Sequence, residues 1–185
     1  MNHPTIWYLM RGSGVVTLIL FTAAVMLGIA TTKRWRLGRL PRFVTLGLHR
    51  NVALVAVVFL GVHIATAIFD SYAKVSLAQL VIPVPTSGYN FYLGLGALSL
   101  DLLVAVVVTS LLRHRLTQRV WKSVHWLAYG SWPLAFAHGV GIGTDRASTW
   151  FLGTSLVCVA AVGGTIVWRL FELRRPYPKY LGAAS

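Results

Sequence analysis

Four histidines lie within two apolar stretches of the chain, and their spacing is the first feature that points to chemistry. His49 and His63 stand fourteen positions apart, and His125 and His138 stand thirteen apart. Imidazole is costly to place in hydrocarbon, and an ionisable side chain inside a membrane helix usually serves a function. Neutral imidazole nitrogen binds haem iron well, and two imidazoles close both axial positions. Four such histidines could therefore hold two haems, one above the other.

The composition is that of a membrane protein. Hydrophobic residues make up 56% of the 185 residues and charged residues only 11%, less than half the charged fraction of an ordinary soluble domain. A spanning helix needs about 20 mainly apolar residues. We therefore predict an all-α, polytopic membrane bundle that forms a single domain over residues 1–185. Five segments are long enough to span, at about 7–31, 48–69, 89–112, 120–141 and 149–171.

The basic residues are distributed unevenly between the connections. Fourteen of the 17 lysines and arginines follow the first, third and fifth predicted spans, whereas Arg11, Lys74 and Arg146 fall on the other side. The positive-inside rule places the larger group in the cytoplasm, so we expect the N-terminus outside and the C-terminus in the cytoplasm. The net charge of +13 then reports membrane topology, and no nucleic-acid partner is expected.

This orientation makes the second and fourth predicted spans parallel. His49 and His125 then lie near the cytoplasmic edge, and His63 and His138 lie toward the outer side. Fourteen residues rise by about 21 Å and thirteen by about 20 Å, so the histidines match in depth. At about 100° per residue, however, His138 is displaced by roughly 140° from the face of His125. We predict a kink or one-residue bulge at Pro133 that rotates the outer half toward the bundle axis.

Other residues could also contact the haems. Propionates near the inner surface would favour cations, and Arg42, Arg50 and Lys122 are candidates, although topology alone explains most of these charges. Asp101 is the one acid within a predicted span; it could bond a histidine or water, pass protons, or stay protonated and hydrogen-bonded within the bundle. Small residues could let a porphyrin approach the backbone, although glycine is common in membrane helices anyway. The candidates are Gly61, Gly130, Gly139, Gly141, Gly153, Gly163 and Gly164.

Short motifs run through most of the chain. They are WYLMRGSG at 7–14, LHR at 48–50, VHI at 62–64, VTSLLR ending at Arg113, WKSVHWLAY at 121–129 and HGVGIGTD ending at Asp145. This set resembles the ferric reductase-like transmembrane domain family, which includes ferric reductases, NADPH oxidases and the membrane haem subunit of bacterial methionine sulfoxide reductase systems. The resemblance implies b-type haem between two helices, with His49 opposite His125 and His63 opposite His138.

The chain departs from that family in two respects. It has five predicted spans where many relatives have six, and it shows no glycine fingerprint of a flavin or nicotinamide domain. We therefore expect a b-type cytochrome of the bacterial plasma membrane with two haems b, the electron-transfer subunit of an oxidoreductase. Its expected partners are membrane lipid, a cytoplasmic flavoprotein or quinol as donor, and an acceptor on the outer side. Flavin would enter only through a partner.

Three alternatives remain open from the sequence. One is a one-haem membrane subunit of a methionine sulfoxide reductase-type system. A second is a histidine-dependent transporter of metal or protons, although transporters more often show paired repeats and several carboxylates around a midplane site. The third is a haem-free scaffold in which the histidines make hydrogen bonds between helices. A visible absorption spectrum distinguishes the cytochrome from the last two.

Overall fold

The structure is a computed structural model that describes residues 3–31, 41–70, 75–82 and 90–174, and the regular structure of these residues is entirely helical. The elements follow one another as α1 (His3–Ala30), α2 (Arg42–Phe69), α3 (Leu77–Val81), α4 (Phe91–Leu111), α5 (Gln118–His125), α6 (Leu127–Ile142) and α7 (Thr149–Arg174). The predicted all-α fold is confirmed.

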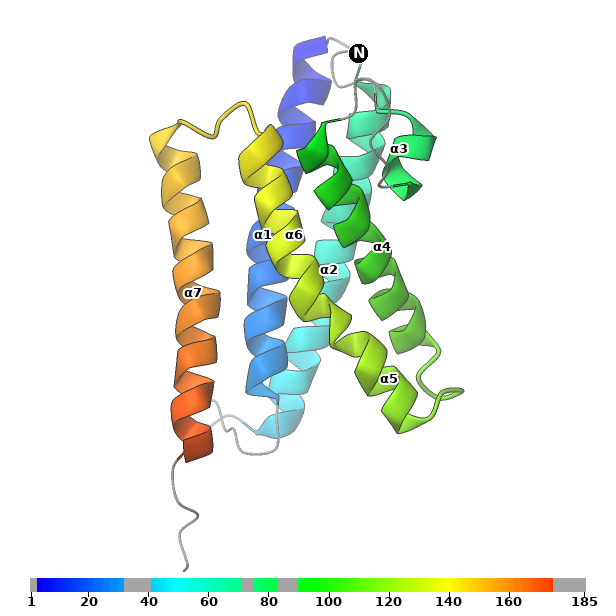
Figure 1. Ribbon diagram of the computed structural model, residues 1–185, viewed down its shortest axis with the longest axis vertical. Coiled ribbons are helices and arrows are strands. Elements are labelled where there is room, and N and C mark those ends of the chain that lie inside the picture. The colour runs from blue at the N-terminus through cyan, green and yellow to red at the C-terminus, as the bar shows by residue number, and fades with distance from the viewer. Residues whose placement is uncertain (1–2, 32–40, 71–74, 83–89, 175–185) are drawn as a thin grey trace, which may run out of the picture.

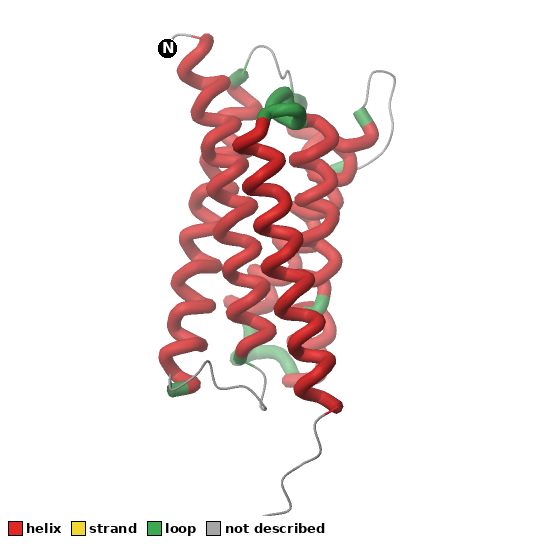
Figure 2. The backbone as a smooth tube through the Cα atoms, turned by 90° about the vertical axis from the view of Figure 1, so that its left-hand side faces the viewer, coloured by secondary structure: helices red, strands yellow, loops and turns green. Residues whose placement is uncertain are grey.

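Long helices run side by side along the molecule (Figures 1 and 2). In the described part of the chain, four of them are long and apolar enough to cross a membrane: Thr5–Ala30 of α1, Arg42–Phe69, Phe91–Leu111 and Thr149–Glu172 of α7. In Figure 1, α7 lies at one side of the bundle and α4 at the other, with α1 and α6 between them.

The fourth predicted span, about 120–141, consists of two helices. α5 ends at His125 and α6 begins at Leu127, and Trp126 caps both. The Tyr129 N–H bonds to the Trp126 carbonyl at 3.0 Å, a three-residue bond that tightens the turn. Pro133 removes one helical N–H but lies inside the continuous α6. The interruption therefore lies at Trp126, directly after His125, and not at Pro133, where the sequence predicts a distortion.

Side-chain oxygens define where several helices begin. Asn90 accepts a hydrogen bond from the Tyr92 N–H at the start of α4, and Thr117 accepts one from the Val120 N–H at the start of α5. Such caps satisfy N–H groups that have no partner within the helix. The polar residues that separate the apolar runs thus fix where α4 and α5 start.

A cluster of buried side chains forms the hydrophobic core where α1, α6 and α7 meet. Its members on α1 follow one another at helical spacing and so share one face of that helix. The cluster contains Leu18, Phe21, Val25, Ile29, Trp132, Cys158 and Val162. The indole Nε1 of Trp132 donates to the Thr22 hydroxyl at 3.0 Å, which links α6 to α1.

Two serines join α4 to α6 in the middle of the bundle. The Ser99 hydroxyl donates to the Ser131 carbonyl at 2.9 Å, and the Ser131 hydroxyl donates to the Ser99 carbonyl at 2.9 Å. Both residues are buried. Hydrogen bonds between small side chains let two apolar helices approach closely, and this contact holds α4 against the helix that carries His138.

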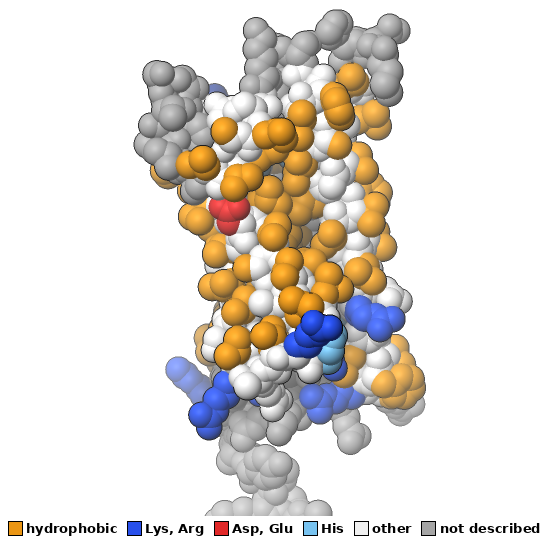
Figure 3. Space-filling model, turned by 90° about the vertical axis from the view of Figure 1, so that its right-hand side faces the viewer, with side chains coloured by type: hydrophobic (Ala, Val, Ile, Leu, Met, Phe, Trp, Pro, Cys, Tyr) orange, Lys and Arg blue, Asp and Glu red, His pale blue; other side chains and the backbone are white. Residues whose placement is uncertain are grey.

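The two ends of the bundle differ in charge. Figure 3 shows the side on which α4 lies: hydrophobic side chains cover the middle, and lysines and arginines gather below. We call the lower end, where α2 begins and α5 lies, the basic end, and the opposite end the α3 end. Exposed cations in the helices of the basic end include Arg42, Arg50, Arg119 and Lys122.

Candidate functional site

The four histidines lie as two pairs between α2 and the α5–α6 segment. The ring centres of His49 and His125 are 6.2 Å apart with the planes at 75°, and we call these residues the α5 pair. The ring centres of His63 and His138 are 6.4 Å apart with the planes at 81°, and we call these residues the α6 pair. The structure thus brings together the residues that the sequence predicts to face one another.

These separations leave room for an atom between the rings. A metal bound at about 2.0–2.1 Å by two imidazole nitrogens, each roughly 1.1 Å from its ring centre, separates the centres by roughly 6.3 Å. A direct N–H···N hydrogen bond of about 2.9 Å would bring the centres to roughly 5.1 Å. Both pairs match the first arrangement, and among the described residues no hydrogen bond joins the two rings of a pair.

One ring nitrogen of three of the histidines is bound to a backbone carbonyl. The Nδ1 contacts are His49 to Ala24 at 2.9 Å, His63 to Met10 at 2.8 Å and His138 to Tyr92 at 2.8 Å. A carbonyl oxygen only accepts, so in each bond the proton lies on Nδ1 and Nε2 keeps its lone pair. Histidines that bind metals are usually oriented in this way by a carbonyl or carboxylate.

A glycine stands four residues after each of these carbonyls, at Gly14, Gly28 and Gly96. A Cβ at Gly96 would lie 2.5 Å from the His138 Nδ1, one at Gly14 2.9 Å from the His63 Cε1, and one at Gly28 3.3 Å from the His49 Cε1. Because contacts below about 3 Å are not tolerated without movement, the missing side chains let the rings reach the carbonyls of the preceding turn.

The sequence did not single out these three glycines. Five of its seven candidates face open space, since a Cβ at Gly61, Gly139, Gly153, Gly163 or Gly164 would meet nothing within 4 Å, and of these Gly139 lines a cavity beside the α6 pair. Gly141 is an exception, because a Cβ there would overlap the ring of Tyr92. The sequence does contain a pattern that could have identified two of the three glycines, because Gly14 and Gly28 are fourteen residues apart, as are His49 and His63.

His125 has a different neighbourhood. Its Nδ1 lies 3.5 Å from the Ser110 hydroxyl, which also accepts a 3.4 Å hydrogen bond from the Trp121 indole. The Trp121 ring stacks on His125 with centres 5.0 Å apart. Ser110 stands fourteen residues after Gly96, where the pattern on α1 has a glycine. A hydrogen bond of this length is weak, so stacking contributes more to the orientation of His125 than it does for the other three.

A cavity of about 590 Å³ opens beside the α6 pair. Both histidines of this pair line it, together with Gly14 and Gly96. Its volume lies within the usual range for small-molecule sites, about 300–1,000 Å³. The remaining lining is mainly apolar, with polar side chains that include Arg11, Gln79, Asn90 and Asp145. The cavity is thus an apolar slot with a few polar groups.

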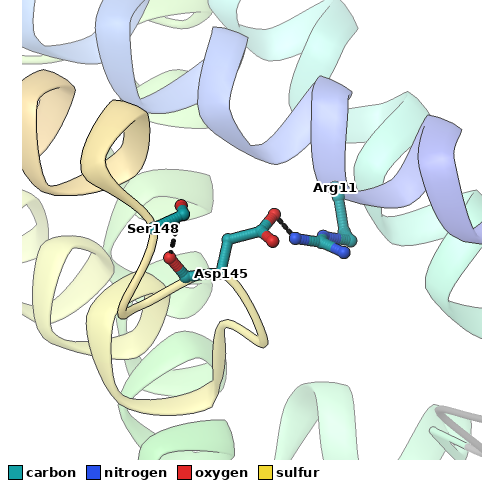
Figure 4. A network of polar contacts seen from close by, with 3 residues as sticks. All are labelled: Arg11, Asp145 and Ser148. Carbon is teal, nitrogen blue, oxygen red and sulfur yellow. Dashed lines mark hydrogen bonds and ion pairs between the residues drawn. The ribbon is translucent and has the colours of Figure 1, made fainter.

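Two of these polar residues form an ion pair (Figure 4). Arg11 pairs with Asp145, and the Ser148 hydroxyl donates to the Asp145 carbonyl at 2.7 Å. The Arg11 guanidinium also lies 3.9 Å from the centre of the Trp7 ring, a cation–π contact. The ion pair joins α1 to the connection between α6 and α7. From the sequence, Arg11 counted only as a topological charge, and its place in the cavity lining was missed.

The other charged residues predicted for the site make no hydrogen bond to the paired histidines in the described part of the chain. Arg42, Arg50 and Lys122 are exposed at the basic end, and their contact with a propionate stays a prediction. Asp101 is half-buried on α4, and it makes no hydrogen bond or ion pair with the residues that the structure describes. The described residues hold no group of three or more His, Cys, Asp or Glu that could bind a bare metal ion. A haem iron needs only two such ligands.

The described geometry can now be set beside known proteins. The model of a family described as "Domain of unknown function (DUF8596)" matches residues 5–145. The chain belongs to this family. The matched region contains all four histidines and ends before α7. The comparisons with curated proteins and with solved structures found no match. The family description assigns no activity, so the resemblance to the ferric reductase-like domain stays a prediction.

Proposed function

We propose that this protein is a transmembrane b-type cytochrome whose two histidine pairs bind two haems and pass electrons across the membrane. The observation that carries the proposal is the separation of the ring centres, 6.2 and 6.4 Å, in pairs whose Nδ1 atoms are largely occupied by backbone carbonyls. Bound haem would supply the one-electron chemistry, and the protein would supply the ligands and their surroundings.

The chain's own residues would hold each haem in a defined way. His49 with His125 and His63 with His138 would each hold one haem iron, and ligation by two neutral imidazoles favours electron transfer over binding of a small gas. The Nδ1 hydrogen bonds orient the rings and increase the basicity of Nε2. Arg42, Arg50 and Lys122 are the candidate partners of haem propionates at the α5 pair, whereas Arg11, which lines the cavity beside the α6 pair, is already paired with Asp145.

The proposed path runs along the bundle. His49 and His63 stand fourteen residues apart on one continuous helix, a rise of about 21 Å. The positive-inside rule puts the basic end in the cytoplasm of a plasma membrane. Electrons would enter at the α5 pair from a cytoplasmic flavoprotein or quinol and leave at the α6 pair to an acceptor on the outer side. Flavin would come only with a partner.

An absorption spectrum of the purified protein tests the haem assignment. The oxidised and dithionite-reduced forms should show a Soret band and α bands of low-spin b haem, with two haems per chain by pyridine haemochrome assay. His114→Ala is the matched control because His114 is exposed and lies outside both pairs. Absence of haem would refute the cytochrome, and one haem per chain would select the one-haem alternative.

Electron transfer across the bilayer needs a separate test. The protein is reconstituted in vesicles with ferricyanide trapped inside, and dithionite is added outside. Reduction of the trapped ferricyanide should depend on the protein and should be lost in His49→Ala, while His114→Ala conducts like the wild type. If His49→Ala retains full conduction, the α5 pair is not on the path.

A further inference from the structure

The two halves of the bundle repeat one pattern of contacts. On α1 and α2, the Met10 carbonyl and Gly14 receive His63, and on α4 and α6 the Tyr92 carbonyl and Gly96 receive His138. Gly28 and Ser110 occupy equivalent places, because each stands fourteen residues after the first glycine of its helix. The halves run in the same direction and face each other through the histidines. An approximate two-fold axis parallel to the helices therefore relates α1 to α4 and α2 to α6.

α7 covers the seam between α1 and α6. There, Leu18, Phe21 and Val25 of α1 and Trp132 of α6 belong to the same buried cluster as Cys158 and Val162 of α7. The repeat gives every one of these α1 and α6 positions an equivalent on the other side of the bundle. That other side is the seam between α4 and α2.

The equivalent seam is hollow and open. The repeat relates α1 to α4 by 82 positions, as from Gly14 to Gly96, and α2 to α6 by 75 positions, as from His63 to His138. The equivalents of Leu18, Phe21 and Val25 are therefore Leu100, Leu103 and Val107, and the equivalent of Trp132 is Val57. All of these equivalents line a cavity of about 200 Å³ between α2 and α4, whose lining is wholly apolar. Smaller side chains at the equivalents of Phe21 and Trp132 leave the space unfilled. No helix in the described part of the chain covers this seam, as α7 lies on the opposite side of the bundle (Figure 1).

A carboxyl group lies beside the open seam. Exposed apolar residues follow one another along the outward face of α4, namely Leu98, Val104, Val108 and Leu111. Asp101 falls within this row at helical spacing and has no hydrogen-bond or ion-pair partner in the described chain. An acid on a lipid-facing surface is costly, and such groups in membrane proteins are almost always paired.

We propose that a transmembrane helix of a second polypeptide lies along the seam between α2 and α4, where it is the counterpart of α7. It carries a lysine or arginine at the depth of Asp101, so that charge complementarity fixes its register. The described spans of a second copy do not offer that cation through Arg11, because Arg11 is already paired with Asp145. The proposal does not depend on haem.

Model peptides can test the seam in vesicles. The probes are two acceptor-labelled leucine–alanine peptides of about 22 residues, one with a central lysine and one with leucine there. A donor is attached to His114→Cys in the exposed loop, since Cys158 is buried. The lysine peptide should bind the full chain about three- to tenfold more tightly than the leucine peptide, as expected for one interhelical polar contact. Asp101→Leu should abolish that preference, and Leu98→Ala should keep it.

A second pair of variants locates the binding site. A Cβ at Gly61 or at Gly153 would meet nothing within 4 Å, but only Gly61 lines the cavity between α2 and α4. Gly61→Phe should therefore weaken binding of both peptides, whereas Gly153→Phe on α7 should not. Equal binding of the two peptides to the wild type would overturn the proposal. So would energy transfer between two copies of the chain that Gly61→Phe abolishes, because a second copy would then fill the seam.

Discussion

The α5 pair and the α6 pair have almost the same spacing between their rings but different surroundings. Both histidines of the α6 pair bond to carbonyls and pack on glycines, and a cavity adjoins them. In the α5 pair only His49 has this support, while His125 depends on Ser110 and the stacked Trp121. Stronger Nδ1 hydrogen bonds make a better electron-donating ligand. If the two pairs bind haem as proposed, we expect the same ligand type to give two haems with different potentials, the α6-pair haem having the lower one.

Removing one ligand should produce the largest difference between the pairs. His138→Ala should lower the haem content by half and leave the spectrum of the α5-pair haem, because each pair binds its haem through its own two rings. Haem-to-protein ratio and the reduced spectrum measure this. His114→Ala should keep the wild-type ratio, and a variant His138→Ala that loses all haem would show that the two sites do not bind independently.

Adding a methyl group at the glycines should give a graded effect. Gly96→Ala should be the most harmful, then Gly14→Ala, then Gly28→Ala, following the Cβ distances of 2.5, 2.9 and 3.3 Å to the rings. Overpacking of this kind costs about 1–3 kcal/mol of stability. Thermal unfolding and haem retention measure the series.

Gly12→Ala is the control for the glycine series. A Cβ at Gly12 would meet nothing within 4 Å, so its effect should be neutral or slightly stabilising, since alanine favours a helix over glycine by about 1 kcal/mol. An order that does not follow the distances would contradict the idea that these glycines admit the histidine rings.

Substitutions at Ser110 should shift the reduction potential of the α5-pair haem and leave that of the α6-pair haem unchanged. Ser110→Gly restores the pattern found beside the other histidines and gives His125 access to a backbone carbonyl, so the potential of the α5-pair haem should fall toward that of the α6-pair haem. Ser110→Ala removes the hydroxyl oxygen that faces the His125 Nδ1 and should raise the potential of the α5-pair haem. Redox titration followed at the α bands measures both. Thr154→Ala on the exposed face of α7 should move neither potential, and a shift of the α6-pair haem would contradict the assignment.

The smallest effect is expected at the α3 end. Asp145→Asn removes one charge of the ion pair with Arg11, whose side chains are 18% and 28% exposed. A partly exposed pair is screened and contributes about 0–1 kcal/mol. The unfolding temperature should fall slightly at low salt and should match the wild type at high salt. A large loss of stability at both salt concentrations would show that Asp145 does more than pair with Arg11.

The arrangement of the bundle followed from local features of the sequence. Apolar length predicts the helices, and spacing predicts the depth of His49, His63, His125 and His138, because both depend on the rise of a single helix. The angular mismatch between His125 and His138 also indicated that the fourth span is distorted. Its location depends on contacts between helices, and these place the interruption at Trp126.

The surroundings of the histidines could not be predicted in the same way. Gly14 and Gly28 resemble every other glycine of a membrane helix until α1 is packed against α2, and only then does a missing Cβ expose a carbonyl. The charge of Arg11 is the same whichever face of α1 points into the bundle, so the sequence does not show whether Arg11 lines a cavity or only contributes to the membrane topology. The packing of the whole bundle determines which helix faces meet, and this packing determines the roles of both the glycines and Arg11.

The reciprocal hydrogen bonds of Ser99 and Ser131 bear on how the protein matures. They lie between the two histidine pairs and involve only α4 and α6, so this hairpin can close in the bilayer as soon as α6 has been synthesised. The hairpin of α1 and α2 is closed in turn by the bonds from His49 and His63 to Ala24 and Met10. The chain would thus form two closed hairpins, and under the proposed function haem would add a second link between them beside the Trp132–Thr22 hydrogen bond.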